Sequence, residues 1–336
     1  MYKIAIIGVN GLVGKAILQS IHTLHLENHN YRFFGCVDGE IIFNGVQKVE
    51  KFYLNVLNDI DYAILAVDNS VVRNIYEYIS NEKLSIIVID NSSEYRLCPN
   101  VPLCIPEINS HIINSHDLEY KKFISNPNCV TTLICMIIKP LLELANIRRI
   151  VASTYQAASG AGYKGLEELE TQTKQIVLNE NLKMDFWKRQ YVYNVFSHNS
   201  KINENGFNEE EMKIINETKK ILDIKCKITA TCIRVPTLRS HCISLNVEFD
   251  KELCTNDIIS RLNNFKGIKL YEFPEENKFP EPVFTSQKTD VYVGRIRPDI
   301  DDFKCWNFFI SGDQLLKGAG YNSVQILKHL IESRLN

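Results

Sequence analysis

Short apolar segments alternate with helical stretches at the start of the chain. Residues 2–7 are almost continuously apolar and predict a buried strand, followed by a glycine-containing turn and a helix over about 12–24. Alternating strands and helices are typical of a parallel, doubly wound α/β sheet. Further strands are predicted at 31–37, 61–67 and 84–89, and a further helix at 70–79.

The pattern changes after about residue 125, where the strands become longer and apolar residues alternate with polar ones. Such strands predict a mixed or antiparallel sheet, so we expect a second, α+β domain. The polar stretches 179–208 and 272–288 are interpreted as loops. The predicted strands lie at 149–155, 228–235, 243–249, 290–296 and 304–311, and the helices at about 127–145, 165–180, 209–222, 255–264 and 315–334.

Composition and charge narrow the class of protein. The 336 residues are 45% hydrophobic and 23% charged, which is typical of a globular chain long enough for two domains. A net charge of −2 provides no basic footprint for nucleic acid or an anionic membrane. The longest apolar stretch, 134–145, is shorter than the roughly 18 residues of a membrane span. We therefore expect neither nucleic acid nor membrane as a partner.

The N-terminus and the cysteines indicate a cytoplasmic protein. Met1 leads directly into the first predicted strand, without the features of a secretory signal. The ten cysteines form no C-x-x-C pair and their spacings do not repeat. Reduced thiols are therefore the simpler interpretation.

The turn after the first strand contains Gly8, Gly11 and Gly14. Glycines there allow a tight turn and close approach of the backbone to a pyrophosphate, which the following helix N-terminus can bind. The spacing differs from the common G-x-G-x-x-G. A plain strand–helix turn therefore remains an alternative to a dinucleotide site.

One cysteine has the sequence setting of a nucleophile. Asn126 is suited to cap a helix and Pro127 to occupy its first position, which would bring Cys129 into the first turn. The positive end of the helix dipole favours a thiolate at that point. The other nine cysteines are interpreted as small packed hydrophobes.

Arg234 and His241 bracket a short proline-containing segment. A thiolate nucleophile needs an acid or base within hydrogen-bond reach, and His241 is one candidate among eight histidines. His22, His25 and His29 share a helical stretch, which we interpret as a solvated face because no further metal ligands are evident. No metal is expected.

Two further patterns have ordinary explanations as well as functional ones. The glycine-rich segment 154–162 follows a predicted strand and could lie against a ligand, but it also fits a simple strand–helix loop. Glu210 and Lys213 lie one helical turn apart on one face, and most such pairs are exposed and have no specific role.

Taken together, the motifs resemble those of the aspartate-semialdehyde dehydrogenase family, from Met1 to about residue 334. They occur in the family's order, which makes chance similarity improbable. The motifs are SNPNC (125–129), TYQ-x-x-SGAG (154–162), RVP (234–236) followed by His241, GRIR (294–297), GDQLLKGAGYNSVQI (312–326), and DNSSEYR…VPLCIPEIN (90–109).

The resemblance implies a fold and a reaction. Residues 1–126 with the helix at 315–336 would form a Rossmann-type nucleotide-binding domain. Residues 127–314 would form an α+β catalytic and dimerisation domain like that of glyceraldehyde-3-phosphate dehydrogenase. The implied reaction is the reversible NADPH-dependent reduction of 4-phospho-L-aspartate to L-aspartate 4-semialdehyde and phosphate, in amino-acid biosynthesis. It proceeds through a cysteine thioester, in a homodimer or a dimer of dimers.

The resemblance also implies roles by position. Cys129 matches the nucleophile, His241 the acid/base, and Gln156 the residue that holds substrate beside the cysteine. Arg234 matches the residue that forks the substrate carboxylate, a geometry that lysine cannot copy. The other implied substrate contacts are Asn128 beside the cysteine, Glu210 for the ammonium group, and Arg96 and Lys213 for phosphate.

The cofactor half departs from the family pattern. Asn10 replaces a threonine of the glycine turn, and Asp38 lies where members often carry Arg-Ser for the NADP 2′-phosphate. A carboxylate there usually binds the ribose hydroxyls of NAD and repels a 2′-phosphate, so NADP is expected from the family and NAD from this departure. The implied cofactor contacts are Gly8, Asn10, Gly11, Leu12, Val13, Asp38, Ser159, Gly160 and Gln314.

Two other functions remain open. N-acetyl-γ-glutamyl-phosphate reductase shares the fold and thioester chemistry, but its N-acylated substrate needs no carboxylate partner such as Glu210; malonyl-CoA reductase is more remote. A non-catalytic paralogue would explain the altered cofactor contacts, but it need not retain Cys129, Gln156, Arg234 and His241.

Overall fold

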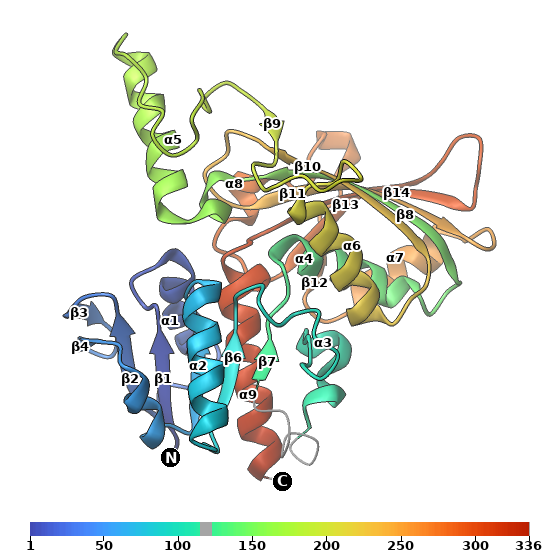
Figure 1. Ribbon diagram of the computed structural model, residues 1–336. Coiled ribbons are helices and arrows are strands. Elements are labelled where there is room, and N and C mark those ends of the chain that lie inside the picture. Colours follow the sequence, from blue (N-terminus) through green and yellow to red (C-terminus); the bar gives the residue numbers. More distant parts are fainter. Residues whose placement is uncertain (115–122, 336) are drawn as a thin grey trace. The chain divides into compact units, whose positions relative to one another are not determined.

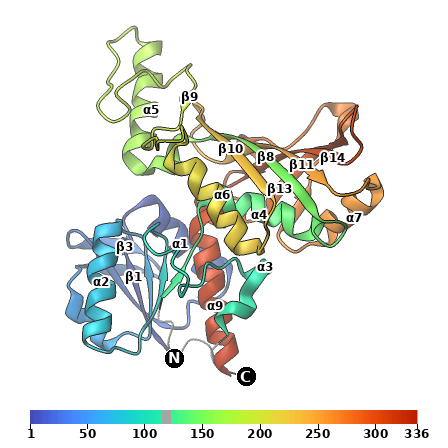
Figure 2. The same ribbon diagram turned by 45° about the vertical axis from the view of Figure 1, so that its right-hand side comes forward.

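The computed structural model describes residues 1–114 and 123–335, and the chain divides into two units. The first unit comprises Met1–Asn128 and the C-terminal segment from Ala319, and the second comprises Cys129–Gly318. Each unit contains its own seven-stranded sheet (Figures 1 and 2). That one unit binds the cofactor and the other performs catalysis stays a prediction.

The first sheet confirms the predicted parallel α/β architecture. Its strand order is β3-β4-β2-β1-β5-β6-β7, and all neighbouring pairs are parallel except the β3–β4 hairpin. The chain crosses from one side of β1 to the other between β2 and β5, as in doubly wound folds. The strands are β1 (Lys3–Ile7), β2 (Asn30–Gly35), β3 (Gly39–Ile42), β4 (Val46–Lys51), β5 (Tyr62–Leu65), β6 (Ile87–Asp90) and β7 (Phe123–Ser125).

Helices cover both faces of this sheet, which explains why β1 is apolar throughout. Successive side chains of a strand point to opposite faces. Ile4 and Ile6 pack in one core cluster with α1 and α9, whereas Ala5 and Ile7 pack in another with α2. The helices are α1 (Leu12–Thr23), α2 (Asn69–Asn81) and α9 (Tyr321–Leu335).

The first unit differs from the sequence prediction in several places. The short elements η1 (Leu54–Asp59), α3 (Pro106–Asn109) and η2 (Ser110–Ile113) were not predicted, nor was β7. Two further differences have a visible reason. The β3–β4 hairpin was not predicted, because apolar residues such as Ile42 and Val46 are exposed and leave little alternation to detect. The last helix was predicted from residue 315, but a π-helical turn (Leu316–Gly320) precedes α9. Gly320 lies so close to α1 that a Cβ there would be 2.7 Å from the backbone of Ala16.

The second sheet confirms the predicted mixed architecture. Its order is β12-β13-β14-β11-β8-β10-β9, with β8–β10 and β12–β13 parallel and the other neighbouring pairs antiparallel. The strands are β8 (Ile147–Gln156), β9 (Phe196–Ser197), β10 (Lys227–Arg234), β11 (His241–Phe249), β12 (Ile268–Leu270), β13 (Val291–Pro298) and β14 (Cys305–Gly312).

One face of the second sheet lies against α4, α6 and α7 (Figure 1). The alternation along β8 reflects this cover, since Ile150 and Ala152 are buried and Arg149 is exposed. These helices are α4 (Cys129–Leu141), α6 (Glu209–Leu222) and α7 (Thr255–Asn264). The short helical elements of this unit are η4 (Ala158–Ala161), η5 (Pro274–Glu276) and α8 (Pro282–Thr285).

Helix α5 (Gly162–Val177) organises the polar segment that follows it. The buried Glu168 accepts a hydrogen bond from the Trp187 N–H at 2.9 Å, and the Gln172 side-chain oxygen accepts one from the Tyr191 N–H at 2.7 Å. The backbone N–H groups of this irregular segment are therefore bonded to two side chains on one face of α5 instead of to a neighbouring strand or helix. These two side chains fix Trp187 and Tyr191 in the small core between α5 and the loop.

A capping box starts α6. The Asn208 side chain accepts from the Glu211 N–H, and the Glu211 carboxylate accepts from the Asn208 N–H, both at 2.9 Å. The other Glu211 oxygen accepts from the Cys232 N–H at 3.0 Å, which ties α6 to β10. Glu211 therefore serves the fold.

We predict that Glu211→Ala destabilises the protein by about 1–3 kcal/mol, because the buried Cys232 N–H loses its acceptor. The neighbouring Glu209 is exposed, so Glu209→Ala should change stability by no more than about 0.5 kcal/mol. Urea unfolding of both variants checks the difference. Equal losses would show that Glu211 makes no specific contribution.

Candidate active site and nucleotide-binding turn

Three predicted site residues meet at one edge of the second sheet. Gln156 ends β8 and Arg234 ends β10, and the parallel register pairs them directly. His241 begins β11, which pairs with the other side of β8. All three side chains are buried, with exposed fractions of 1%, 4% and 0%. Strand pairing thus brings together residues that are distant in sequence.

The protonation state of His241 follows from its backbone partner. Its Nδ1 lies 2.9 Å from the Ala157 N–H, which can only donate, so Nδ1 accepts and the neutral ring carries its proton on Nε2. Burial, reinforced by Arg234, lowers the pKa of His241 to about 3. Among the described residues, nothing accepts a hydrogen bond from this buried Nε2. Its N–H is therefore available to a ligand.

Gly160 lies directly beside His241 Nε2 and Arg234, and its lack of a side chain leaves room next to both groups. A Cβ on Gly160 would lie 2.9 Å from His241 Cε1, 3.0 Å from its Nε2 and 3.1 Å from Arg234 Nη1. Any side chain here would press on both groups, because these are tighter than ordinary contacts. The glycine that the sequence assigned to the cofactor is thus required by the His241–Arg234 pair.

Arg234 is held on several sides. Its Nη2 lies 2.7 Å from His198 Nε2, its Nη1 donates to the Ala157 carbonyl at 3.1 Å, and its Nε lies 3.5 Å from Asn199 Oδ1. The guanidinium carbon lies 5.5 Å from the centre of the Trp187 ring, in cation–π range. The orientation of this cation is therefore set before any ligand binds.

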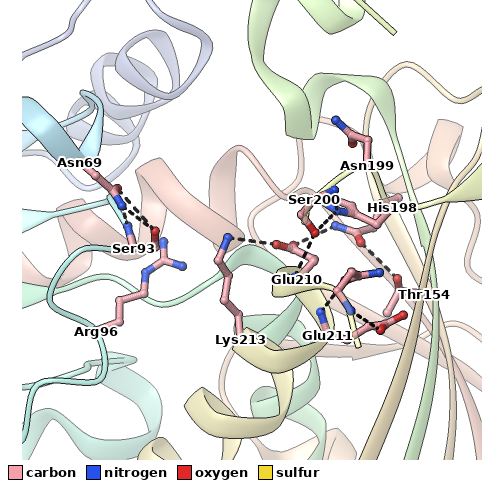
Figure 3. A network of polar contacts seen from close by, with 12 residues as sticks. Asn69, Ser93, Arg96, Thr154, His198, Asn199, Ser200, Glu210, Glu211 and Lys213 are labelled. Carbon is pink, nitrogen blue, oxygen red and sulfur yellow. Dashed lines mark hydrogen bonds and ion pairs between the residues drawn. The ribbon is translucent and has the colours of Figure 1, made fainter. Parts of the chain in front are cut away.

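A buried carboxylate also belongs to this site, and Figure 3 shows it, Glu210, beside Lys213. Glu210, 5% exposed, accepts from Gln156 Nε2 at 3.1 Å and pairs with Lys213 Nζ at 3.5 Å. Burial lowers the pKa of Arg234, and the charge of Glu210 opposes that shift. Gln156 in turn accepts from Thr154 Oγ1 at 3.2 Å. The edge thus presents both signs of charge to a ligand.

Cys129 is the first residue of α4. The helix begins two residues later than predicted, so Pro127 precedes it and Asn126 is not its cap. Instead, Asn126 Oδ1 accepts from the Asn322 side chain at 2.7 Å. Cys129 nevertheless lies in the first turn, where the helix dipole favours a thiolate. Gly318 packs against it, since a Cβ there would be 2.7 Å from Cys129 Cβ.

The remaining cysteines have different surroundings. Burial raises the pKa of the Cys242 thiol to about 11 and raises those of Cys135 and Cys232 further. Such thiols are packed hydrophobes, as predicted, but the prediction is wrong for two of the nine cysteines, which are exposed. The buried cysteines are Cys104, Cys135, Cys226, Cys232 and Cys242, and the exposed ones are Cys36 and Cys254.

Two predicted substrate contacts belong to the first unit. Arg96, 7% exposed, donates through Nη2 to the Asn91 carbonyl at 2.8 Å. The turn that carries it begins at Asp90, whose carboxylate accepts from the N–H and hydroxyl of Ser92, each at 2.8 Å. Asn128, 6% exposed, is the last residue before the second unit. That these two residues contact substrate stays a prediction.

The glycines of the first turn have different roles. Gly8 has a φ of 90°, and a Cβ on it would lie 2.1 Å from the Ala66 oxygen. A Cβ on Gly14 would lie 2.4 Å from the Gly8 oxygen, so the fold itself requires both glycines. A Cβ on the exposed Gly11 would meet only an ordinary contact at 3.5 Å. Gly11 directly precedes α1, where Leu12 and Val13 begin the first turn. Helix N-termini are able to bind phosphate, and that this one does so stays a prediction.

Asp38 lies three residues beyond Gly35, the last residue of β2. It is exposed, and its Oδ1 accepts from the Lys51 N–H at 2.9 Å, which ties it to β4. Asn10 approaches the end of β2, since a Cβ on Gly35 would be 3.0 Å from its Nδ2. Both departures from the family pattern therefore lie near the end of β2, where dinucleotide ribose groups bind in this fold.

Ser159 and Gln314 contact each other in the second unit. The buried Gln314 side chain donates to Ser159 Oγ and accepts from the Ser240 N–H at 2.8 Å. Gln314 thus braces the residue before His241. That Ser159 and Gln314 contact a cofactor stays a prediction.

Among the residues that sequence reasoning missed, His198 and Trp187 contact Arg234, and Gly318 packs against Cys129. His198 and Trp187 lie in a polar segment interpreted as a loop, where nothing local distinguished them. Gly318 lies within a recognised motif, and its glycine was the available signal.

No helix of the described residues is long and apolar enough to cross a membrane. Those residues also contain no group of three or more His, Cys, Asp or Glu side chains that could hold a metal.

The buried His241 predicts a pH dependence of stability. Its pKa is about 3 when folded, against an ordinary value of 6.5, so acid protonates the unfolded chain first. Its contribution is fully present above pH 6.5 and is lost as the pH falls toward 3, with a slope of up to about 1.4 kcal/mol per pH unit. His241→Gln should flatten the fall of urea stability between about pH 6.5 and 5. The exposed His25→Gln is the control, and equal slopes would refute the assignment.

Comparison with known proteins identifies two matching domain families. Residues 3–116 match the semialdehyde dehydrogenase NAD binding domain, and residues 138–317 match the semialdehyde dehydrogenase dimerisation domain. The chain is 37% identical over 334 residues to aspartate-semialdehyde dehydrogenase of Prochlorococcus marinus, covering 98% of this chain and 95% of that relative.

Solved structures agree with this assignment. Aspartate semialdehyde dehydrogenase II from Vibrio cholerae is 28% identical, with a TM-score of 0.92 over 99% of each chain. A structure of the same enzyme complexed with ASA is 27% identical, with a TM-score of 0.91 over 99% of this chain and 98% of that one. The motifs, both domain matches and the whole-chain identity agree, and the chain therefore belongs to the aspartate-semialdehyde dehydrogenase family.

Proposed function

We propose that the chain catalyses the reversible, NADPH-dependent reduction of 4-phospho-L-aspartate to L-aspartate 4-semialdehyde and phosphate, in the aspartate family of amino-acid biosynthesis. The observation that carries the proposal is that one sheet edge holds a buried Arg234, paired in register with Gln156, and a buried Glu210, which accepts a hydrogen bond from the Gln156 side chain. A ligand with both a carboxylate and an ammonium group satisfies both charges. The relative complexed with ASA supports the same substrate class.

Cys129 is the proposed nucleophile. Its thiolate, stabilised at the start of α4, attacks the acyl phosphate carbon; a thioester forms and phosphate leaves. A nicotinamide cofactor, when bound, would supply the hydride that reduces the thioester to a thiohemiacetal, from which the aldehyde and the thiolate separate. In the oxidising direction the same thiolate would add to the aldehyde to form a thiohemiacetal, and loss of a hydride to the oxidised cofactor would leave the thioester. Phosphate would then attack the thioester carbon and displace the thiolate, giving the acyl phosphate.

His241 is proposed to act through Nε2. The Ala157 N–H keeps the ring proton on that atom, where it can stabilise and protonate the substrate oxygen as charge develops there. The low pKa of His241, caused mainly by burial, keeps the resting ring neutral.

The other predicted contacts complete the substrate site. Arg234 binds the α-carboxylate through two parallel hydrogen bonds, and Glu210 accepts from the ammonium group. Gln156 and Asn128 hold the reacting end of the substrate beside Cys129. Arg96 and Lys213 receive the phosphate, whose roughly two negative charges suit two cations. Glu210 also separates this substrate from an N-acylated one, which has no ammonium group to pair.

The cofactor proposal rests on the first unit. The open Gly11 and the start of α1 suit the pyrophosphate, and the NAD binding domain match supports a nicotinamide dinucleotide. We propose NADP as the family cofactor, with Asp38 favouring acceptance of NAD. The dimerisation domain match supports a homodimer through the second unit.

An assay tests the proposed function. Wild-type protein should reduce NADP when both L-aspartate 4-semialdehyde and phosphate are present, and Cys129→Ser should lower kcat by at least about 10³-fold. The exposed Cys254→Ser is the matched control and should keep wild-type activity. Absence of phosphate-dependent turnover in wild type would refute the function, and an active Cys129→Ser would refute the nucleophile.

A second prediction concerns the cofactor. Asp38→Asn keeps an acceptor for the Lys51 N–H and removes one negative charge, so it isolates electrostatics. Relative kcat/KM for NADP over NAD should rise roughly tenfold, since about 1.4 kcal/mol of relieved repulsion suffices. Glu40 is exposed on β3, which directly follows Asp38, and Glu40→Gln should leave the NADP-over-NAD ratio unchanged. If Asp38→Asn also leaves it unchanged, Asp38 does not face the ribose.

A further inference from the structure

His198 is bonded directly to the guanidinium proposed to bind substrate. Its Nε2 lies 2.7 Å from Arg234 Nη2, and a guanidinium can only donate, so Nε2 is an unprotonated acceptor. Burial, together with the charge of Arg234, lowers the pKa of His198 to about 4. The imidazole is therefore neutral at physiological pH.

The other ring nitrogen links His198 to the acidic side of the site (Figure 3). With Nε2 accepting, Nδ1 carries the proton and donates to Ser200 Oγ at 3.0 Å. The Ser200 N–H also approaches Nδ1, at the longer distance of 3.3 Å, but the 2.7 Å contact with Arg234 fixes the tautomer because the guanidinium can only donate. Ser200 Oγ also accepts from the Glu210 N–H at 3.2 Å. A chain of hydrogen bonds thus connects Arg234, His198, Ser200 and the start of α6.

The backbone of His198 is fixed as well. It follows β9, where Phe196 pairs with Arg234, and its N–H donates to the Cys232 carbonyl at 2.8 Å. The ring is therefore attached to the same strand, β10, that carries Arg234.

The N–H groups of the Arg234 guanidinium can be divided into those bonded within the protein and those left for a ligand. A guanidinium has five N–H groups. One on Nη2 is directed at His198, one on Nη1 at the Ala157 carbonyl, and the Nε–H faces Asn199. Counting contacts with the described residues only, one N–H remains on each terminal nitrogen, which is the number that a forked carboxylate accepts.

We infer that His198 is a positioning residue: as a neutral acceptor it sets the orientation of Arg234 so that the two remaining N–H groups face the substrate carboxylate. This inference rests on the proposed function, in which Arg234 binds that carboxylate. Neutrality is essential to the role, because an acidic acceptor at position 198 would also orient the guanidinium but would cancel its charge and compete with the substrate.

Three substitutions at His198 separate these properties. His198→Gln keeps a neutral acceptor, His198→Leu removes the acceptor, and His198→Glu supplies a charged one. In the oxidising direction, His198→Leu and His198→Glu should raise the KM for L-aspartate 4-semialdehyde roughly tenfold or more, the expected loss for a hydrogen bond to a charged group. Their kcat and their KM for phosphate should stay near wild type, and His198→Gln should restore most of the loss.

A truncated substrate provides the decisive readout. 3-Aminopropanal lacks only the α-carboxylate, so the preference of wild type for the semialdehyde over this analogue, as a ratio of kcat/KM, should shrink roughly tenfold in His198→Leu. A general structural defect would instead lower both values together and overturn the inference. If His198→Leu fails to fold, the Gln and Glu variants still differ in the charge on which the inference depends.

The outcomes also separate this inference from the proposed function. A wild type without phosphate-dependent oxidation of the semialdehyde would overturn both. An active wild type whose semialdehyde KM is unchanged in His198→Leu, or equal in His198→Gln and His198→Glu, would overturn the inference alone.

Discussion

The parallel pairing of β8 with β10 is the constraint on which the candidate site depends. It brings Gln156 and Arg234 to the same level at the ends of their strands, and β11 adds His241 from the other side of β8. Because side chains alternate along a strand, a slip of one residue would turn Arg234 to the opposite face. The buried apolar residues that hold this register therefore also position the charged ones.

Burying the Arg234 guanidinium is costly unless fixed partners surround it. The structure supplies a carbonyl from Ala157, a neutral ring nitrogen from His198 and the nearby charge of Glu210. Both histidines of the site remain neutral, because burial and the cation lower their pKa values. The site thus retains a cation and an anion for a ligand without adding a third buried charge.

Close packing explains why glycines occur where the chemistry is concentrated. A side chain on Gly160 would press on His241 and Arg234, and one on Gly318 would displace Cys129. Gly8 and Gly14 are required by the first turn itself, whereas Gly11 has room on its outer side. Of the three turn glycines, Gly11 is therefore the one whose identity is best explained by a ligand.

The sequence by itself determined the two types of sheet, the helices that flank them and the family, because strand and helix periodicity and the motifs are local features. It also singled out Cys129, since a helix start can be recognised from its neighbours, although the start was misplaced by two residues. Only the tertiary structure decided that the Glu210 carboxylate bonds to the Gln156 side chain and that His198 meets Arg234. It alone assigned the His241 proton to Nε2. These features arise from contacts between residues 36, 54 and 84 positions apart, and no local pattern encodes them.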